Sequence, residues 1–297
     1  MQVAKLFASL WLFMCISVPA QDVRPPEWAP AYVKVPVDLG GLFNSTVNMT
    51  AELFKPDGSG PFPVLIYSHG RSSTAKERAD IKEVIPRDYL QFWLDKGFAV
   101  VAPLRPGYGA TGGADREVPG HGWDSTTGHC IRTPNYSRVM EVASPTVLAT
   151  IAWIQKQPWA NTSALVLTGN SVGGILTVAV GSQNPVGVVG LINFAGGIGG
   201  NPSLSPGKSC DSNQLLDMYR RYGKTSKIPS LWMYAENDLF WGSEMPKAWH
   251  ASFSQAGGNS QLVTTAPLTH RDGHDLVFEG KHLWMPSVEA FVKRLGY

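Results

Sequence analysis

The sequence is short of cysteine, carries no large excess of either charge and repeats no segment. Its 297 residues include three cysteines, and 25 lysines and arginines stand against 23 acidic residues, so the net charge is +2. Without a basic stripe, the chain lacks the electrostatic footprint of a nucleic-acid-binding protein. Its 31 glycines and 22 prolines are spread out, which indicates many turns and no low-complexity block. A hydrophobic content of 43% suffices for one large α/β domain or two small ones.

Beyond residue 20 no apolar run is long enough to cross a bilayer, and residues 1–20 have the pattern of a secretory signal peptide. Lys5 supplies a positive charge, residues 6–18 are apolar but too short to span the membrane, and Ala20 ends a possible cleavage site. We expect cleavage there to leave residues 21–297 as a single domain of a secreted or periplasmic protein with no membrane attachment. A retained N-terminal anchor is the alternative.

Two cysteines, Cys130 and Cys210, remain after removal of the signal peptide. Exported proteins fold in oxidising compartments, where an even number of cysteines favours disulfide formation. We therefore predict a Cys130–Cys210 disulfide, with two buried free thiols as the alternative. No metal site is expected, because the spacing of His121, His129 and Cys130 matches no zinc-binding pattern.

The hydrophobic pattern predicts an α/β fold built on a mostly parallel sheet. Residues 33–39 and 47–54 alternate apolar and polar positions, which indicates two antiparallel strands. From residue 62 onward, short apolar runs alternate with amphipathic stretches of helical period. That order favours parallel strands with helices on both faces and the antiparallel pair at one edge. Ligands of such sheets bind beyond the carboxyl ends of the strands.

Two segments, 110–138 and 196–212, interrupt this alternation. Long loops without their own periodicity usually serve a site in a compact domain, so we expect these segments to be insertions that cover the active site. After the first insertion, Ser144-Pro145 predicts the start of a helix, with the serine as N-cap and the proline at the first helical position.

The most informative stretch is residues 165–174, Leu-Val-Leu-Thr-Gly-Asn-Ser-Val-Gly-Gly. An apolar run of strand length leads into Gly-x-Ser-x-Gly, and a helical pattern follows at once, as a nucleophile elbow requires. The tight turn would lift the Ser171 hydroxyl above the sheet edge. It would also direct the Val172 N–H, at the helix N-terminus, to the place where an oxyanion forms. An incidental serine in a glycine-rich turn is the alternative.

A serine nucleophile needs a base, and the base needs an acid to orient it. After an elbow serine the acid comes first in the chain and the histidine second. Asp238 follows the second strand after the elbow and is the expected acid, with Glu236 as a rival nearer the strand. His274 follows the last strand, where Gly273 lets the backbone come close, and we prefer it as the base over His270.

A second N–H for the oxyanion is expected from the loop after residues 62–67, the strand that precedes the first helix. That loop contains His69-Gly70-Arg71, so the backbone of Arg71 should donate while Gly70 leaves room for an acyl group. The His69 side chain precedes the serine, which is the wrong order for a base, and we expect it to brace the loop.

Three aromatic residues lie on loops expected to border the cleft and are candidates for an apolar acyl or aryl pocket: Trp123, Phe240 and Trp241. Ordinary packing is the alternative for each.

Together these motifs resemble the α/β-hydrolases, and within them the exported dienelactone-hydrolase-like branch. The segments that carry the resemblance are His69-Gly70, Arg105-Pro106-Gly107-Tyr108-Gly109, residues 169–174, Asn237-Asp238 and Asp272-Gly273-His274. The enzymes that gave the branch its name use a cysteine nucleophile, whereas position 171 is serine here, which favours a general serine esterase.

The resemblance implies hydrolysis of a small-molecule carboxylic ester through an acyl-enzyme, with Ser171, His274 and Asp238 as the triad and with no metal or organic cofactor. Two alternatives stay open. A peptidase or amidase of the same fold could use the same triad, although no acidic cluster for an amino terminus stands out. A catalytically inactive binding protein could keep the fold, although the complete set of triad residues argues against it.

Overall fold

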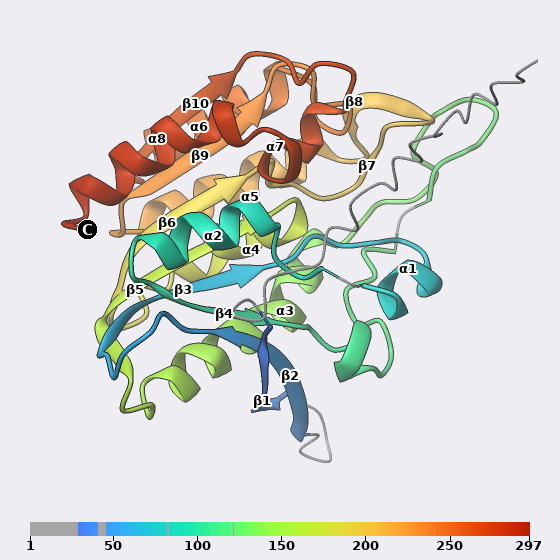
Figure 1. Cartoon of the computed structure of the whole chain (residues 1–297). Helices are drawn as coiled ribbons and strands as arrows, with labels where there is room; N and C mark the ends of the chain where they lie inside the picture. The colour runs from blue at the N-terminus through green and yellow to red at the C-terminus, as the bar shows by residue number, and fades with distance from the viewer. Residues whose placement is uncertain (1–28, 41–45, 82, 121) are drawn as a thin grey trace, which may run out of the picture.

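An eight-stranded mixed sheet forms the centre of the molecule (Figure 1). The computed structural model describes residues 29–40, 46–81, 83–120 and 122–297, so the predicted signal peptide lies outside the described residues. From edge to edge the strands are β1 (Ala31–Asp38), β2 (Thr46–Phe54), β4 (Ala99–Pro103), β3 (Phe62–Ser68), β5 (Ala160–Asn170), β6 (Val188–Phe194), β9 (Ser230–Ala235) and β10 (Ser260–Thr265). β2 is antiparallel to both of its neighbours, and all other neighbours are parallel. The predicted fold class is confirmed, including the antiparallel pair at one edge.

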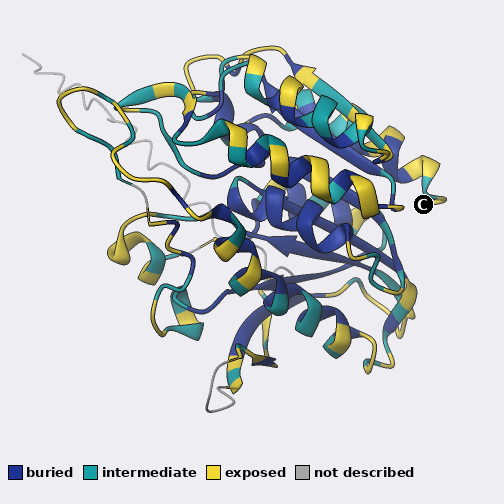
Figure 2. Ribbon diagram, turned by 180° about the vertical axis from the view of Figure 1, so that it is seen from behind, coloured by how far each residue is buried: buried dark blue, intermediate teal, exposed yellow. Residues whose placement is uncertain are grey.

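Helices cover both faces of the sheet. Successive strand residues point to opposite sides, and because both sets are apolar in the central strands, each face needs a covering layer. In β3, Val64 and Ile66 face one core, whereas Leu65 and Tyr67 face the other. The first core includes residues of α3 (Tyr136–Ile154), α4 (Val172–Gly181), α5 (Ser212–Thr225) and α6 (Glu244–Gln255). The second includes residues of α2 (Arg87–Asp95), α7 (Leu276–Glu279) and α8 (Lys281–Arg294). Figure 2 shows the buried strands between these two layers.

A short helix, α1 (Ala75–Ala79), lies outside both cores and buries none of its residues. In the part of the chain that the structure describes, no helix has the combination of length and apolarity needed to cross a bilayer.

Helix α3 begins well before the Ser144-Pro145 pair, so the predicted helix start is wrong. Asn135 is the N-cap, and its side chain accepts a backbone N–H of the first turn at 2.9 Å. Tyr136 is fully buried, and its hydroxyl is 3.1 Å from that of Ser209. Pro145 therefore lies inside the helix and removes one intrahelical hydrogen bond. Burial of the first turns stabilises the earlier start of the helix more than a Ser144 cap would stabilise a later start.

The two predicted insertions lie side by side and are joined covalently. Residues 196–212 contain a two-stranded hairpin of β7 (Gly200–Asn201) and β8 (Ser205–Ser209). Residues 110–138 form a long loop that runs into the first turn of α3, and Figure 1 shows it reaching out beside β7 and β8. The predicted disulfide between Cys130 and Cys210 is present, with the two Cα atoms 5.3 Å apart.

Candidate active site

Ser171 occupies a sharp turn between β5 and α4. Its backbone has φ 55° and ψ −123°, a conformation that costs a residue with a Cβ atom about 1–3 kcal/mol. The packing beneath explains the glycine two residues later, since a Cβ on Gly173 would lie 1.9 Å from the carbonyl oxygen of Ser68 in β3. The Gly-x-Ser-x-Gly pattern therefore encodes a turn that presses against β3 and presents the serine beyond the end of its strand.

A cavity of about 310 Å³ opens beside Ser171. Ser171 and His274 both line it, together with Gly70 and Arg71 of the loop after β3 and Phe240 of the loop after β9. These loops all follow the carboxyl ends of parallel strands, the place where ligands bind in open α/β sheets. Between the Ser171 hydroxyl and the His274 ring, both of which the structure describes, no hydrogen bond is present. Such bonds often tighten only in a substrate complex.

Asp238 and His274 are hydrogen-bonded, with Oδ2 of the aspartate 3.1 Å from Nδ1 of the histidine. The other aspartate oxygen accepts two backbone N–H groups of the loop after β9, at 2.8 and 3.1 Å, which fixes the carboxylate. Asp238 is 2% exposed and His274 9%, whereas Glu236 and His270 are both exposed. The structure thus brings Asp238 and His274 together and leaves the two rival residues at the surface.

The surroundings of His274 favour its protonated form. Burial alone would lower its pKa, because the imidazolium loses water. The charge of Asp238 and the hydrogen bond to it outweigh that loss, and Asp272 and Asp275 add to their effect, so the pKa of His274 is raised. The aspartate therefore stabilises the form that a histidine takes after it has accepted a proton from a nucleophile.

Asn237 and Gly273 hold the loop of His274 against the loop after β9. The Asn237 amide donates to two carbonyls of the histidine loop, at 3.0 and 2.9 Å, and accepts one of its backbone N–H groups at 2.9 Å. A Cβ on Gly273 would lie 2.6 Å from the backbone nitrogen of Asp238. The glycine thus permits the direct contact between the two loops that the Asp238–His274 hydrogen bond requires.

The three candidate pocket residues take different positions. Phe240 lines the cavity and stacks on the His274 ring, with the ring centroids 4.0 Å apart. Trp241 is 2% exposed and meets the same ring edge-on at 5.6 Å, but it is not among the residues that line this cavity. Trp123 lies in the first insertion, in an isolated β-bridge with Cys130. Of the three, Phe240 is the one that borders the cavity.

The two candidate oxyanion donors come from the helix that follows Ser171 and from the loop after β3. Val172 is the first residue of α4, so its N–H has no partner within the helix and lies at the positive end of the helix dipole. Arg71 lines the cavity, and its side chain pairs with Asp115, with 2.6 Å between Nη2 and Oδ2. A Cβ on Gly70 would lie 3.4 Å from the Cβ of Ser171, which shows how closely this loop approaches that serine.

Sequence reasoning missed several residues of the cavity wall. Asn170 lines the cavity, and its Oδ1 accepts the Tyr67 hydroxyl at 2.9 Å. An apolar part of the wall comes from Ile81, Val84 and Phe278. The position of Asn170 within the Gly-x-Ser-x-Gly pattern was a signal that could have identified it. The apolar residues carry no such signal, because they come from segments nearly 200 positions apart.

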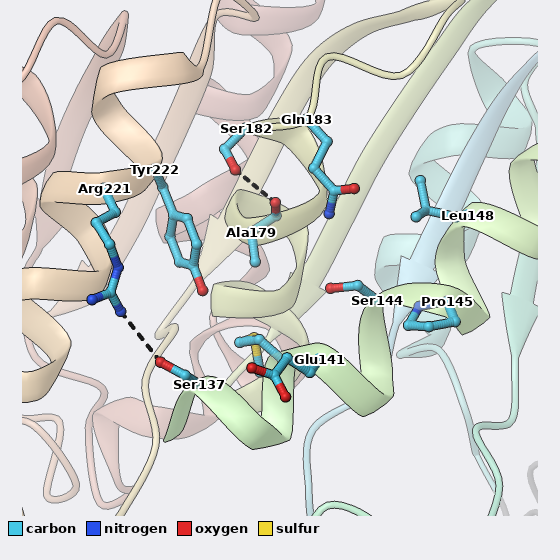
Figure 3. Close-up of a pocket in the computed structure, with 11 residues that line it drawn as sticks. Ser137, Glu141, Ser144, Pro145, Leu148, Ala179, Ser182, Gln183, Arg221 and Tyr222 are labelled. Carbon is cyan, nitrogen blue, oxygen red and sulfur yellow. Dashed lines mark hydrogen bonds between the residues drawn. The ribbon is translucent and has the colours of Figure 1, made fainter. Parts of the chain in front are cut away.

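A second cavity, of about 570 Å³, lies between α3, α4 and α5. Figure 3 shows its lining, where Arg221 donates to the Ser137 hydroxyl at 3.2 Å. Ser182 places this cavity at the C-terminal end of α4, whereas Ser171 stands at the N-terminal end. None of the candidate catalytic residues lines it.

The residues considered as metal ligands are described only in part. His121 lies outside the described residues, and Cys130 is bonded to Cys210. Among the residues that the structure does describe, no three His, Cys, Asp or Glu side chains are arranged to hold a metal ion.

No family model and no curated protein matches the sequence. Solved structures do match, and an esterase from Pyrococcus furiosus gives a TM-score of 0.61 at 13% identity, over 94% of this chain and 96% of that chain. An acetyl xylan esterase from a Paenibacillus species gives 0.58 at 16% identity, over 91% and 86%. A Klebsiella pneumoniae protein assigned as a dienelactone hydrolase gives 0.53 at 16% identity, over 88% and 99%. At these identities the likeness concerns the fold alone, and with the strand order it identifies the chain as a protein of the α/β-hydrolase fold.

Proposed function

We propose that this protein is a serine hydrolase of the dienelactone-hydrolase-like type that cleaves carboxylic esters through an acyl-enzyme. The observation that carries the proposal is the Asp238–His274 hydrogen bond at the wall of the cavity that Ser171 also lines. Structural neighbours named as esterases support the same reaction class. The cavity, of about 310 Å³ and partly apolar, has a size suited to a small ester.

In the proposed reaction, Ser171 Oγ attacks the ester carbonyl while Nε2 of His274 takes the hydroxyl proton. Asp238 accepts the Nδ1–H of His274, which leaves Nε2 free to act as the base. The backbone N–H groups of Arg71 and Val172 stabilise the oxyanion. The C–O bond to the alcohol then breaks, and the imidazolium gives its proton to the leaving alkoxide. Water then attacks the acyl carbonyl while His274 takes its proton, the bond to Ser171 Oγ breaks, and the imidazolium returns the proton to the serine as the acid leaves.

We also propose that residues 1–20 direct export of a single domain, residues 21–297. The Cys130–Cys210 disulfide is compatible with an oxidising compartment. Sequencing the N-terminus of the mature protein tests this proposal. A mature protein that still begins at Met1 would contradict it.

The enzymatic proposal is tested with a fluorophosphonate probe and with p-nitrophenyl acetate. We expect the wild type to react with both and Ser171→Ala with neither. Ser203→Ala is the control, because Ser203 is an exposed serine that does not line the cavity. Faster cleavage of amino-acyl p-nitroanilides than of the ester would favour a peptidase or amidase. A folded wild type that neither labels nor hydrolyses would favour a binding protein.

A further inference from the structure

The motif Arg105-Pro106-Gly107-Tyr108-Gly109 has no part in the chemistry proposed above, yet Arg105 is only 1% exposed. A buried guanidinium loses its hydration, so it needs a counter-charge and hydrogen-bond acceptors. Glu117, 3% exposed, supplies the charge from the first insertion. Its two carboxylate oxygens accept from Nε at 2.5 Å and from Nη2 at 3.2 Å.

The remaining donors of Arg105 bind the loop after β3. Nη1 donates to the carbonyl oxygen of His69 at 2.7 Å, and Nη2 donates to that of Gly70 at 3.1 Å. One planar guanidinium therefore holds two successive carbonyls of the loop that carries Arg71.

The His69 ring fixes the same loop from a second direction. Its Nε2 lies 3.2 Å from the backbone nitrogen of Arg105, and its Nδ1 lies 2.7 Å from the carbonyl oxygen of Gly70. Because a backbone N–H can only donate, Nε2 is the acceptor, so Nδ1 carries the proton and donates to Gly70. Burial, together with the charge of Arg105, holds the pKa of His69 well below its usual range, which keeps the ring neutral in this tautomer.

These contacts determine the direction of one N–H group. The carbonyl of Gly70 and the N–H of Arg71 belong to the same planar trans peptide, so they point in opposite directions. Two donors, from Arg105 and His69, hold the Gly70 oxygen on the interior side. The N–H of Arg71 is thereby turned away from the interior, and Arg71 lines the cavity beside Ser171.

The rest of the motif brings Glu117 back to Arg105. Gly107 has φ +95°, and a Cβ there would lie 3.1 Å from the carbonyl oxygen of Ala114, so the returning chain can pass close by. The ring of Tyr108 packs on that of His69, with centroids 4.5 Å apart, and its hydroxyl lies 3.5 Å from Glu117.

We propose that the buried Arg105–Glu117 pair is the positioning unit of the oxyanion hole. It holds the carbonyls of His69 and Gly70 so that the Arg71 N–H faces the developing oxyanion, and the first insertion supplies the carboxylate that makes this possible. Arg105, Glu117 and His69 are positioning residues that act through the Arg71 peptide. The inference rests on the esterase function proposed above.

The experiment compares the wild type with the double variant R105M/E117L. Replacing both members of a buried pair with apolar residues leaves no unpaired charge, so the fold should be retained. We expect kcat for p-nitrophenyl acetate to fall by about 10- to 100-fold, less than complete loss of an oxyanion donor, with KM changed by less than about threefold. Affinity for a trifluoromethyl ketone, which forms a tetrahedral adduct on the serine, should fall by the same factor as kcat/KM.

Two further variants keep the test decisive. Arg105→Lys retains the charge beside Glu117 but replaces the planar guanidinium with a point charge, so it should lose part of the activity. This variant therefore tests the proposal if the double variant does not fold. Val37→Ala, in β1 and fully buried away from the cavity, should lower Tm but leave kcat unchanged. That control separates loss of stability from loss of positioning.

The inference is overturned if folded R105M/E117L or Arg105→Lys keeps kcat and the affinity for the ketone within about twofold of wild type. It is also overturned if Val37→Ala, at a comparable loss of Tm, shows the same fall in kcat and in affinity for the ketone. A Ser171→Ala variant that still hydrolyses the ester, or a wild type that does not, instead refutes the proposed function itself. The two kinds of failure are therefore distinguishable.

Discussion

Replacing Asp238 by asparagine should remove most of the activity while leaving the fold in place. The substituted side chain can still accept the two backbone N–H groups that now bind Oδ1. Its amide nitrogen, however, would face Nδ1 of His274 where Oδ2 now lies, at 3.1 Å. Two N–H donors cannot share that contact, so the imidazole should move its proton to Nε2, the atom that must accept from Ser171.

The wrong tautomer in a triad lowers kcat by about 10⁴-fold. At 1.36 kcal/mol for each factor of ten, this corresponds to about 5 kcal/mol of transition-state stabilisation. A second effect concerns pH. Asp238 raises the pKa of His274 against the opposite effect of burial, so without its charge the pKa should fall. The acid limb of the residual activity should therefore move to lower pH than in the wild type.

The assay is kcat/KM for p-nitrophenyl acetate from about pH 5 to pH 9, with Tm measured on the same samples. Glu236→Gln is the matched control, because Glu236 is an exposed carboxylate two positions away and its loss should change neither quantity. The reasoning fails if Asp238→Asn keeps more than about a tenth of the wild-type kcat/KM, or if its acid limb does not move.

Three further predictions concern packing, covalent linkage and pH. Gly273→Ala places a Cβ 2.6 Å from the backbone nitrogen of Asp238, so the two loops must separate. We expect at least about a tenfold loss of kcat/KM, and unchanged kinetics would contradict the close approach. Changing both Cys130 and Cys210 to serine removes a disulfide that joins positions 80 residues apart. We expect the free energy of unfolding to fall by about 4–5 kcal/mol and Tm by roughly 10 °C, and an unchanged Tm would contradict this. Because the pKa of His274 is raised in the folded state, this residue adds to the free energy of unfolding, fully below about pH 6.5 and less as the pH rises through the folded pKa. Urea unfolding measured across this pH range should show the dependence in the wild type and not in His274→Gln.

The sequence predicts those parts of the fold and site that depend on short-range patterns. Strand alternation and the elbow motif give the sheet and Ser171, because both are encoded within about ten residues. The order of acid and histidine after the elbow selects Asp238 and His274, which the structure places in contact. The identity of their partner loops follows from the sheet, since parallel neighbouring strands end on the same edge.

Features that depend on tertiary burial were not predictable. The start of α3 at Tyr136 depends on contacts with β8, about 70 positions away, so the local Ser144-Pro145 signal was misleading. The Arg105–Glu117 pair gave no signal either, because nothing in a single sequence distinguishes a buried carboxylate from a solvated one. Its role becomes visible only when the direction of each carbonyl is known.

The backbone strain at Ser171 has a consequence for how such a protein changes over generations. Glycine would adopt φ 55° without the conformational penalty of about 1–3 kcal/mol that serine incurs in the folded state. The greater freedom of glycine in the unfolded chain would cost roughly 1 kcal/mol of stability, which is at most equal to that gain. Stability therefore favours glycine over serine at this position, and the proposed use of the hydroxyl in catalysis would be what retains the serine. In a lineage that no longer used the proposed reaction, residue 171 would be among the first positions to be substituted, while the surrounding turn would persist.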